Sequence, residues 1–566
     1  MRSLLLSWLA KSQNRAHESH CSFTEISNGN HSYRSLGSDY YVDINVENIP
    51  GARLILFNRD LAQELNLDLP ESDEELERIM LENFAWFKCA DQQSGPITDS
   101  KTVKTYFATR YQDSDNKSEG SALGDGRAIW VGEIVSEPHP GSFRYLDVVL
   151  KGTGVTPLAW FNHPRQSHKD GMASMTEVVH EYIYSAAARK NGINTAGVLA
   201  VIELPFYREI DNEKAAIIVR VGNHLRFAHF LYFSDSPALL KKIFEYALKR
   251  DMGFSLDHPI TVEDIRKYLD LVVTKLAENA AVYFDVHAVH GSPTFGNKTS
   301  CGGSIDMATF VFPDAHHVNY SYMSEGANLL GGVNGQTEQF FNLFGHLVKT
   351  LKKSGFEYQM EILPVEYFHR QFRNKFEAVL TYRWLKRVGL SDQEIDTLSI
   401  TAKERFYDIV KSIYEATGSK RIRLNKGKVY MAAFEPRRIL SGTADCFDSL
   451  DVTVSVWSKL FKVNRKWGTY KLSDAKSYIV EYRKSIIGIF NDLKASQDTV
   501  AAWKRRSKEI KLSERHEPGA DFFYDSERFL ASEEVLHLIR QGNASWRKIS
   551  QVAETSTLRF VDHLKD

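Results

Sequence analysis

Two oxygen-bearing side chains in the stretch HGSPTFGNKTSCGGSID, residues 290–306, have the chemistry of a metal site. Asn297 and Asp306 lie nine residues apart, and Lys298 is the only charged side chain between them. Amide and carboxylate oxygens are hard ligands of the kind that Mg²⁺ prefers. The stretch therefore indicates a metal–nucleotide site, provided that phosphate-binding groups occur elsewhere in the chain.

Candidate phosphate-binding groups precede this stretch in the segment LGDGRA, residues 123–128. Gly124 and Gly126 stand just before an expected strand, and Arg127 follows them. Glycines allow backbone N–H groups to approach phosphate oxygens, and an arginine adds positive charge. A Gly-x-Gly pattern is more often a plain turn, so this segment alone leaves both interpretations open.

A lysine and a pair of arginines extend the set of candidate cations. Lys151 ends the apolar run VVLK, where a lysine usually extends its amine to the surface. The functional alternative is a phosphate-binding lysine held by a carboxylate, for which Glu181 in the next helical segment is the candidate. Arg220 and Arg226 flank a turn and could grip a polyphosphate from two sides. Two surface arginines would show the same spacing.

Two further groups near the metal stretch are candidates for acid/base chemistry. His290 begins the stretch, and Asp285 ends the helical segment before it. Each is more typical of a structural residue than of a catalytic one.

The elements that must carry these residues change in kind along the chain. Apolar and alternating runs predict strands at 127–135, 144–152, 198–206 and 215–222, with a helix at 174–192 that ends on an Asn-Gly C-cap. From about residue 236 the apolar spacing is mostly helical. This order predicts an α+β fold of the protein-kinase-like, two-lobed kind, in which ATP binds between a small β-rich lobe and a larger helical lobe.

Four regions are expected along the chain. The segment at 71–87 has helical spacing and an acidic start within the first region, and the basic run at 501–515 is typical of a solvated helix face in the last. The expected regions are an N-terminal extension (1–95), a kinase-like N-lobe (96–235), a helical C-lobe with the metal-binding loop (236–454) and a helical C-terminal region (455–566).

Composition excludes several classes of partner. The 566 residues carry 71 Lys and Arg against 72 Asp and Glu, a net charge of -1, which does not favour a nucleic-acid or acidic-membrane surface. No apolar run reaches the length of a membrane span. The segment at 1–17 is basic and lacks acids; a plain first helix is the favoured interpretation over an organelle-targeting or secretion signal.

Cysteine usage indicates a reducing compartment. Cys21, Cys89, Cys301 and Cys446 are too far apart in sequence for a metal knuckle or a C-x-x-C redox pair. We therefore expect a cytoplasmic protein without structural zinc, unless the N-terminus directs it to an organelle or out of the cell.

Taken in order, these segments resemble the selenoprotein O family of pseudokinases. LGDGRA matches that family's first glycine motif, and the resemblance extends over roughly residues 25–350. The other matching segments are LKGTGVTP (150–157), DGMASMTEVVHEY (170–182), RVGNHLRF (220–227) and HGSPTFGNKTSCGGSIDMA (290–308).

The resemblance implies a protein adenylyltransferase that binds ATP in an orientation flipped relative to ordinary kinases. Such an enzyme transfers AMP to a Ser, Thr or Tyr hydroxyl of a protein substrate, with Mg²⁺, or Mn²⁺ in its place, as its metal. By matched position, the nucleotide would contact Gly124, Gly126, Arg127, Lys151, Asp170, Gly171, Arg220 and Arg226. Glu181 would hold Lys151, Asn297 and Asp306 would hold the metal, and Lys151, Glu181 and Asp306 would form the catalytic set.

The sequence departs from the family pattern where the catalytic base is expected. The family's acid before the metal-binding Asn is Gly296 here, and the basic residue of its D-G-R-A motif is Met172. Two alternatives to AMP transfer therefore stay open. One is another ATP-dependent transfer, such as glutamylation or phosphorylation; the other is an ATP-binding scaffold without catalytic activity.

Overall fold

A computed structural model provides the coordinates of this chain. The expected first helix or targeting signal at 1–17, together with Cys89 and Cys446, lies outside the described residues. No described helix is both long and apolar enough to cross a membrane. The structure describes residues 21–88, 103–112, 123–139, 142–159, 169–286, 290, 292, 294–309, 336–353, 365–417, 440, 443, 472–494, 497–513, 526–542 and 544–565.

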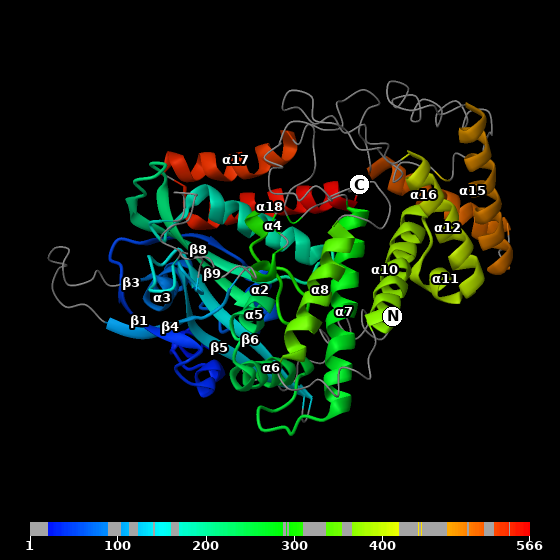
Figure 1. Ribbon diagram of the computed structural model, residues 1–566. Coiled ribbons are helices and arrows are strands. Elements are labelled where there is room, and N and C mark those ends of the chain that lie inside the picture. Colours follow the sequence, from blue (N-terminus) through cyan, green and yellow to red (C-terminus); the bar gives the residue numbers. More distant parts are fainter. Residues whose placement is uncertain are drawn as a thin grey trace, which may run out of the picture.

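One antiparallel sheet forms the centre of the β-rich part (Figure 1). Its strand order is β2-β8-β9-β6-β5-β4-β1-β3, and β7 pairs with β9 beside this path. The strands are β1 (Tyr41–Asn48), β2 (Arg53–Phe57), β3 (Trp86–Lys88), β4 (Val103–Thr109), β5 (Ala128–His139), β6 (Ser142–Lys151), β7 (Ala173–Ser174), β8 (Gly197–Tyr207) and β9 (Lys214–Gly222).

The register of the sheet brings distant cations to one end of one face. Lys151 on β6 lies opposite Ala128 on β5 and Ile218 on β9. Directly opposite residues of antiparallel strands share a face, and so do residues two apart on one strand. Lys151 and Arg220 therefore project from the same face, and Arg127 immediately precedes the paired end of β5.

Both faces of the sheet are buried. Val149 and Ile218 belong to one apolar core together with Val178 of α4, whereas Leu150 and Val219 belong to a second core that also includes residues of α3. The near-continuous apolar runs of β6 and β9 follow from this double coverage. The face that carries Lys151 is therefore the face that α4 covers.

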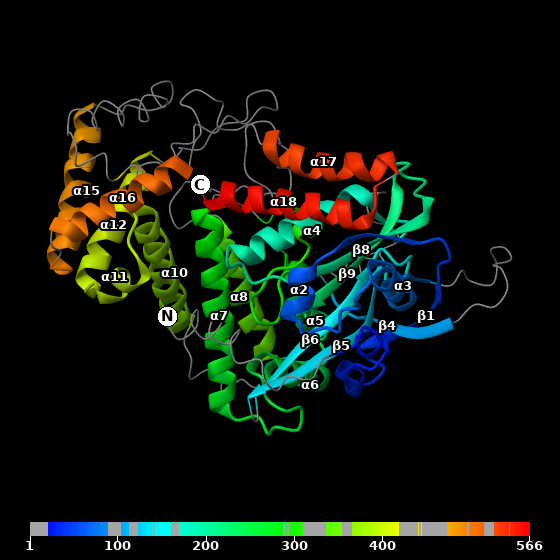
Figure 2. The same ribbon diagram turned by 180° about the vertical axis from the view of Figure 1, so that it is seen from behind.

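Helices surround the sheet and continue away from it. Figures 1 and 2 show α17 and α18 packed along α4, while α10 runs beside α7 with α11, α12, α15 and α16 beyond it. The described α-helices are α2 (Arg59–Glu64), α3 (Asp73–Phe84), α4 (Met175–Lys190), α5 (Phe227–Tyr232), α6 (Pro237–Met252), α7 (Val262–Asp285), α8 (Gln336–Lys352), α10 (Val365–Val388), α11 (Asp392–Thr397), α12 (Ile400–Thr417), α15 (Leu472–Asp492), α16 (Gln497–Ser513), α17 (Ser526–Gln541) and α18 (Trp546–Lys565).

The structure confirms the α+β class and the predicted strands, and α4 ends at the expected Asn191 cap. The segment at 71–87 is not one helix. α3 ends at Phe84, because Trp86 pairs with Asn48 at the edge of the sheet. Strands β1 to β3 of the expected N-terminal extension join the same sheet as β4 to β9, and the four-region division stays a prediction.

Candidate nucleotide and metal site

Three residues predicted to act together meet in one ionic cluster. The Lys151 amine lies 3.2 Å from Glu181 Oε2 and 2.9 Å from Asp306 Oδ1, although Lys151 and Asp306 are 155 residues apart in the chain. Arg220 donates through one guanidinium nitrogen to both Glu181 and Asp306. The sheet supplies the two cations, α4 supplies Glu181, and the loop after α7 supplies Asp306.

Burial divides the cluster into two layers. The side chains of Lys151, Glu181 and Arg220 are 6%, 4% and 2% exposed, and we call them the inner ions. Asp306 is 23% exposed and occupies the solvent-facing side of the cluster. Its φ of +60° places it in the left-handed region, which a non-glycine residue rarely adopts.

The cluster keeps Asp306 and Arg220 ionised. Burial alone would raise the pKa of Asp306, but the charges of Arg220 and Lys151 hold that pKa well below its ordinary value. Burial would lower the pKa of Arg220, and Asp306 and Glu181 raise it above its ordinary value instead. Each ion therefore depends on the others, since an unpaired buried charge is costly.

Glu177, which the sequence analysis did not single out, completes the cluster. It binds Arg127 through two hydrogen bonds of 2.8 and 3.0 Å and lies 2.9 Å from the Lys151 amine. Burial would raise the pKa of Glu177, but Arg127 and Lys151 lower it below its ordinary value. Arg127 and Glu177 are each 19% exposed, and with Asp306 they form the outer ions.

The glycine segment before β5 folds as a tight turn anchored by a second unforeseen residue, Asp125. Asp125 is buried and accepts hydrogen bonds from the Thr109 backbone at 3.0 Å and from Trp130 Nε1 at 2.9 Å. A Cβ on Gly124 would lie 2.0 Å from the Thr109 carbonyl oxygen, so this position requires glycine. The Gly126 carbonyl accepts from the Thr156 backbone at 3.0 Å, which ties the turn to the segment after Lys151.

Arg226 connects the glycine turn with the metal stretch. Its guanidinium donates to the Gly296 carbonyl at 2.8 Å, lies 3.6 Å from the Asp125 carboxylate, and stacks over the Tyr111 ring at 4.5 Å. Arg220 and Arg226 thus have different partners: Arg220 joins the ionic cluster, and Arg226 joins the two loops beside it.

Asp170 and Gly171 lie next to the glycine-rich loop after Lys151. The Gly154 backbone donates to the Gly171 carbonyl at 3.1 Å, and a Cβ on Gly171 would lie 2.2 Å from the Gly154 carbonyl carbon. The Asp170 carboxylate accepts from Arg208 at 3.0 Å. The structure places both residues against the loop, and Asp170 is paired with Arg208 rather than with a cation of the cluster.

The metal-ligand candidates lie on one folded loop, residues 294–306, which we call the metal loop after these candidates. The Ile305 backbone donates to the Asn297 carbonyl at 3.2 Å, which brings Asn297 next to the residue that precedes Asp306. The Asn297 amide nitrogen donates to the Ser292 carbonyl at 3.0 Å, and within the described part of the chain its Oδ1 accepts no hydrogen bond. An amide oxygen that accepts no hydrogen bond among the described residues and a carboxylate on the same loop fit the ligand preferences of Mg²⁺.

Two groups considered for acid/base chemistry have structural partners. Asp285 is buried and binds Arg383 at 2.6 Å and Arg387 at 3.1 Å, which joins α7 to α10. His290 shares a 2.7 Å hydrogen bond with the Ile305 carbonyl, and burial lowers the pKa of His290 to about 4. Both contacts position elements around the metal loop.

A third carboxylate, Asp251 at the end of α6, anchors the far side of the same loop. It accepts from Ser300 Oγ at 2.5 Å, from Asn223 Nδ2 at 2.6 Å and from the Tyr268 hydroxyl at 3.2 Å. Burial raises the pKa of Asp251 to about 7, against the opposing effect of the Ser300 hydrogen bond. The loop is thus held at Ser300 as well as near its two candidate metal ligands.

A second cluster of metal-binding side chains is already paired with an arginine of the protein. The ligand atoms of His31, Glu133 and Asp147 lie within 4.8 Å of one another. Arg250 binds Glu133 at 2.8 Å and Asp147 at 2.5 Å, so an arginine occupies the place that a cation would take. This group does not include Asn297 or Asp306.

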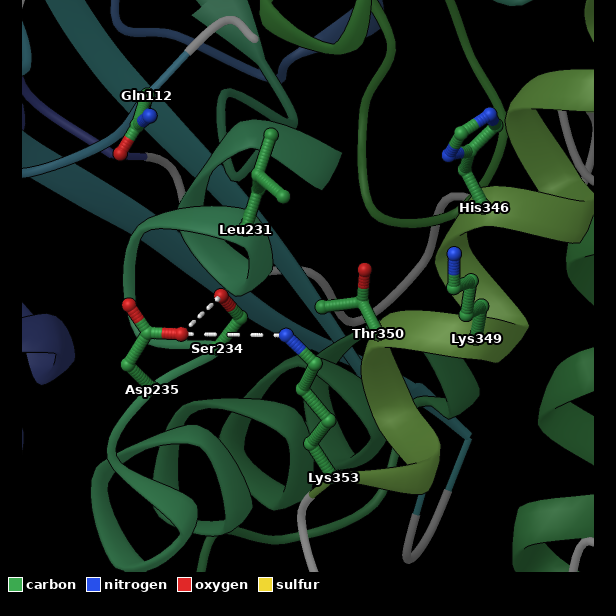
Figure 3. A pocket seen from close by; sticks show the side chains of 8 residues that line it. All are labelled: Gln112, Leu231, Ser234, Asp235, His346, Lys349, Thr350 and Lys353. Carbon is green, nitrogen blue, oxygen red and sulfur yellow. Dashed lines mark hydrogen bonds and ion pairs between the residues drawn. The ribbon is translucent and has the colours of Figure 1, made fainter. Parts of the chain in front are cut away.

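A polar pocket of about 320 Å³ opens between α5 and α8 (Figure 3). None of the predicted nucleotide-site residues lines it, but the ring of His346 meets the ring of Phe295 edge-on at 5.9 Å, next to the metal loop. Asp235 and Lys353 face each other across it at 3.9 Å. The lining residues are Gln112, Leu231, Ser234, Asp235, His346, Lys349, Thr350 and Lys353.

The antiparallel sheet and the helices around it place the chain among the α+β proteins, with an ionic cluster that joins a strand lysine, a helix glutamate and a loop aspartate. Comparison with known families is more specific. The family described as "Protein adenylyltransferase SelO" matches residues 25–462, and the chain belongs to this family.

Curated relatives agree with the family. The chain is 30% identical over 289 residues to the protein nucleotidyltransferase YdiU of Shewanella loihica, a match that covers 50% of this chain and 53% of the relative. It is 33% identical over 217 residues to YdiU of Shewanella pealeana, covering 37% and 42%, and 28% identical over 304 residues to YdiU of Yersinia pseudotuberculosis, covering 51% and 55%. The chain thus spans about half the length of the curated relatives it matches.

Proposed function

We propose that this protein transfers AMP from ATP to a Ser, Thr or Tyr hydroxyl of another protein. The observation that carries the proposal is the contact of Lys151 with both Glu181 and Asp306, at 3.2 and 2.9 Å. A cation on a strand, a carboxylate on a helix and a loop aspartate are the groups that phosphoryl and nucleotidyl transfer need in one place. Membership in the family of protein adenylyltransferases supports the same activity.

Each residue of the site has a role in this proposal. Lys151 and Arg220 neutralise phosphate charge, and Glu181 keeps both cations in position. Arg127 supplies further positive charge on the solvent-facing side of the cluster, and the buried Arg226 adds positive charge where it joins the glycine turn to the metal stretch. The turn at Gly124 and Gly126, and the Asp170–Gly171 turn that packs against the loop after Lys151, shape the space for the nucleotide.

Asn297 and Asp306 would hold the metal. Mg²⁺, or Mn²⁺ in its place, supplies neutralisation of phosphate charge when it is bound there. Asp306 stays ionised at neutral pH because its pKa lies below the ordinary value, so it offers a charged ligand without releasing a proton.

The proposed step displaces pyrophosphate. The acceptor hydroxyl oxygen forms a bond to the α-phosphorus, the bond from that phosphorus to the oxygen bridging to the β-phosphate breaks, and pyrophosphate leaves with the bonding electrons. Gly296 offers no side-chain base, so the hydroxyl proton passes to water or to the leaving pyrophosphate. The resemblance implies a two-lobed, kinase-like arrangement with flipped ATP, which would present the α-phosphate to the acceptor.

Labelled ATP tests this proposal. Incubation of the protein and a cell extract with ATP labelled at the α-phosphate should label proteins, and a γ-phosphate label should not be retained. Lys151→Ala should abolish the α-label, because the buried amine contacts three carboxylates of the cluster. Retention of the γ-label alone would identify a phosphotransferase and overturn the proposal.

A catalytically inactive ATP-binding scaffold is the second candidate. Gly296 favours it, because a general base typically contributes about 10²- to 10⁴-fold to a rate. A scaffold would bind ATP yet retain neither label on protein, so the same experiment separates the two candidates when ATP binding is measured beside it.

A further inference from the structure

Glu177 is a partly exposed carboxylate that Arg127 and Lys151 share. Its carboxylate forms two hydrogen bonds with Arg127, at 2.8 and 3.0 Å, and lies 2.9 Å from the Lys151 amine. Arg127 and Glu177 are both 19% exposed, whereas Glu181, one helical turn further along α4, is 4% exposed. Glu177 is therefore the more solvent-accessible of the two glutamates, and Glu181 is the more deeply buried.

Glu177 makes the cluster electrically balanced. The cations Arg127, Lys151 and Arg220 face the anions Glu177, Glu181 and Asp306, three charges against three. A triphosphate binds through charge-assisted hydrogen bonds from cations, and a carboxylate on the same cation competes for those donors. In the balanced cluster it must either displace a carboxylate or bring enough metal to offset its own charge.

The contacts of Glu177 are not those of an ordinary helix-capping residue. Glu177 is the third residue of α4, and its backbone N–H donates to Ser174 Oγ at 3.2 Å. A glutamate at this position commonly folds back onto the N-cap backbone and completes a capping box, as Asp264 does in α7. The Glu177 carboxylate instead extends to Arg127 and Lys151.

We propose that Glu177 is a built-in competitor of the nucleotide: it holds Arg127 and Lys151 in the nucleotide-free protein and must release Arg127 when a triphosphate binds. This inference rests on the proposed function, because it assumes that ATP enters this site. Glu177 then sets both the affinity for ATP and the amount of divalent metal that binding requires. It acts on the nucleotide through the two cations, as a positioning residue rather than a catalytic one.

The test compares ATP binding by the full-length wild type and Glu177→Gln over a titration of Mg²⁺, measured by calorimetry. Glutamine keeps the shape of the side chain and removes its charge. We expect Glu177→Gln to bind ATP about tenfold more tightly at low Mg²⁺ and to need less Mg²⁺ for half-maximal binding. If Glu177 had only a structural role, its replacement by glutamine would not lower the Mg²⁺ concentration needed for ATP binding.

Glu64→Gln is a matched control. Glu64 forms a two-bond pair with Arg189, at 2.7 Å for each bond, near the opposite end of α4 and outside the ionic cluster. Its replacement should leave ATP affinity and metal requirement as in the wild type. Glu177→Asp, which keeps the charge on a shorter side chain, should give an intermediate affinity and serves as the test variant if Glu177→Gln does not fold.

The outcomes separate the two proposals. If ATP binds the wild type and the folded Glu177 variants equally well at every Mg²⁺ concentration, the competitor role is wrong while the proposed function stands. Tighter binding by Glu64→Gln as well would also overturn it, because a general loss of negative charge would then explain the effect. If neither the wild type nor any variant binds ATP, both proposals fail.

Discussion

Replacing Asp306 with asparagine removes one negative charge from the cluster and keeps the shape of the side chain. The Asp306 carboxylate accepts from the Lys151 amine at 2.9 Å and from Arg220, and it is the proposed charged metal ligand. Loss of a preorganised charge that acts on the transition state costs on the order of 10³-fold in rate, or about 4 kcal/mol. We therefore expect Asp306→Asn to reduce AMP transfer by about that factor.

The same change should leave the protein folded. Breaking a fully buried ion pair by removing one partner costs roughly 3–5 kcal/mol. Asp306 is 23% exposed, and Lys151 keeps Glu181 and Glu177 within 3.2 and 2.9 Å, so we expect a loss of only about 1–2 kcal/mol. Denaturant unfolding measures this loss, and transfer from α-labelled ATP measures the rate on the same samples.

Asp285→Asn is a control variant that separates an effect on stability from an effect on activity. Asp285 is also a carboxylate between two cations, Arg383 and Arg387, but it is 1% exposed and joins α7 to α10. Its replacement should cost about 3–5 kcal/mol of stability and leave transfer per folded molecule unchanged. Wild-type transfer by Asp306→Asn would refute the metal assignment, and an equal loss of transfer in folded Asp285→Asn would show that the assay reports only damage to the fold.

Two further changes test the metal loop. Gly296→Asp restores an acid beside Asn297 and should raise the transfer rate by about 10²-fold if the missing base limits it; an unchanged or lower rate in the radiolabel assay would contradict that reasoning. Asp251→Asn tests the raised pKa of about 7 at Asp251. Because that pKa lies above the ordinary value of 3.8, the folded state loses stability as pH rises from about 4 to 7. Asp251→Asn should remove this pH-dependent loss of stability. The full pKa shift corresponds to about 4 kcal/mol, and we expect a smaller loss because the Asp251 side chain is only partly buried. Equal pH slopes in denaturant unfolding of the two proteins would show that Asp251 titrates normally.

The sequence contained enough to foresee the inner part of the site. Lys151 ends a strand, Glu181 lies in the following helix, and Arg220 ends another strand, so local patterns placed all three on regular elements. The antiparallel register then makes Lys151 and Arg220 neighbours on one face. Strand alternation fixes which side chains of each strand share a face, whereas the pairing of β6 with β9 that makes Lys151 and Arg220 neighbours comes from the tertiary fold.

There is a physical reason why the sequence analysis did not single out Glu177 and Asp125. The helix α4 has buried residues around most of its circumference, so its sequence periodicity does not say which side faces the sheet. The four-residue spacing between Glu177 and Glu181 was the available signal, since residues so spaced lie on the same helix face. Asp125 stands between two glycines, and its buried partners, Thr109 and Trp130, come from separate strands.

Local sequence patterns did not predict that the strands between residues 41 and 88 join the same sheet as the later strands. β2 pairs with β8 through Arg53 opposite Glu203, and β1 pairs with β4 through Tyr41 opposite Thr109. Pairing between strands so distant in the chain depends on tertiary packing rather than on the periodicity of either strand. The segment at 41–88 consequently looked like a separate extension, although its strands complete the sheet.

The two layers of the ionic cluster indicate how the site could exchange partners without losing its framework. The inner ions are at most 6% exposed, so separating them would leave buried charges without counter-charges, at a cost of several kcal/mol. The outer ions are 19–23% exposed, and water can solvate each of them as its protein partner leaves. A nucleotide and its metal would therefore compete with the Arg127–Glu177 pair and with the contacts that Glu177 and Asp306 make to the inner cations, while Lys151, Glu181 and Arg220 stay paired with one another. On this reasoning, variants of the outer ions change affinity and metal dependence, and variants of the inner ions change the stability of the fold as well.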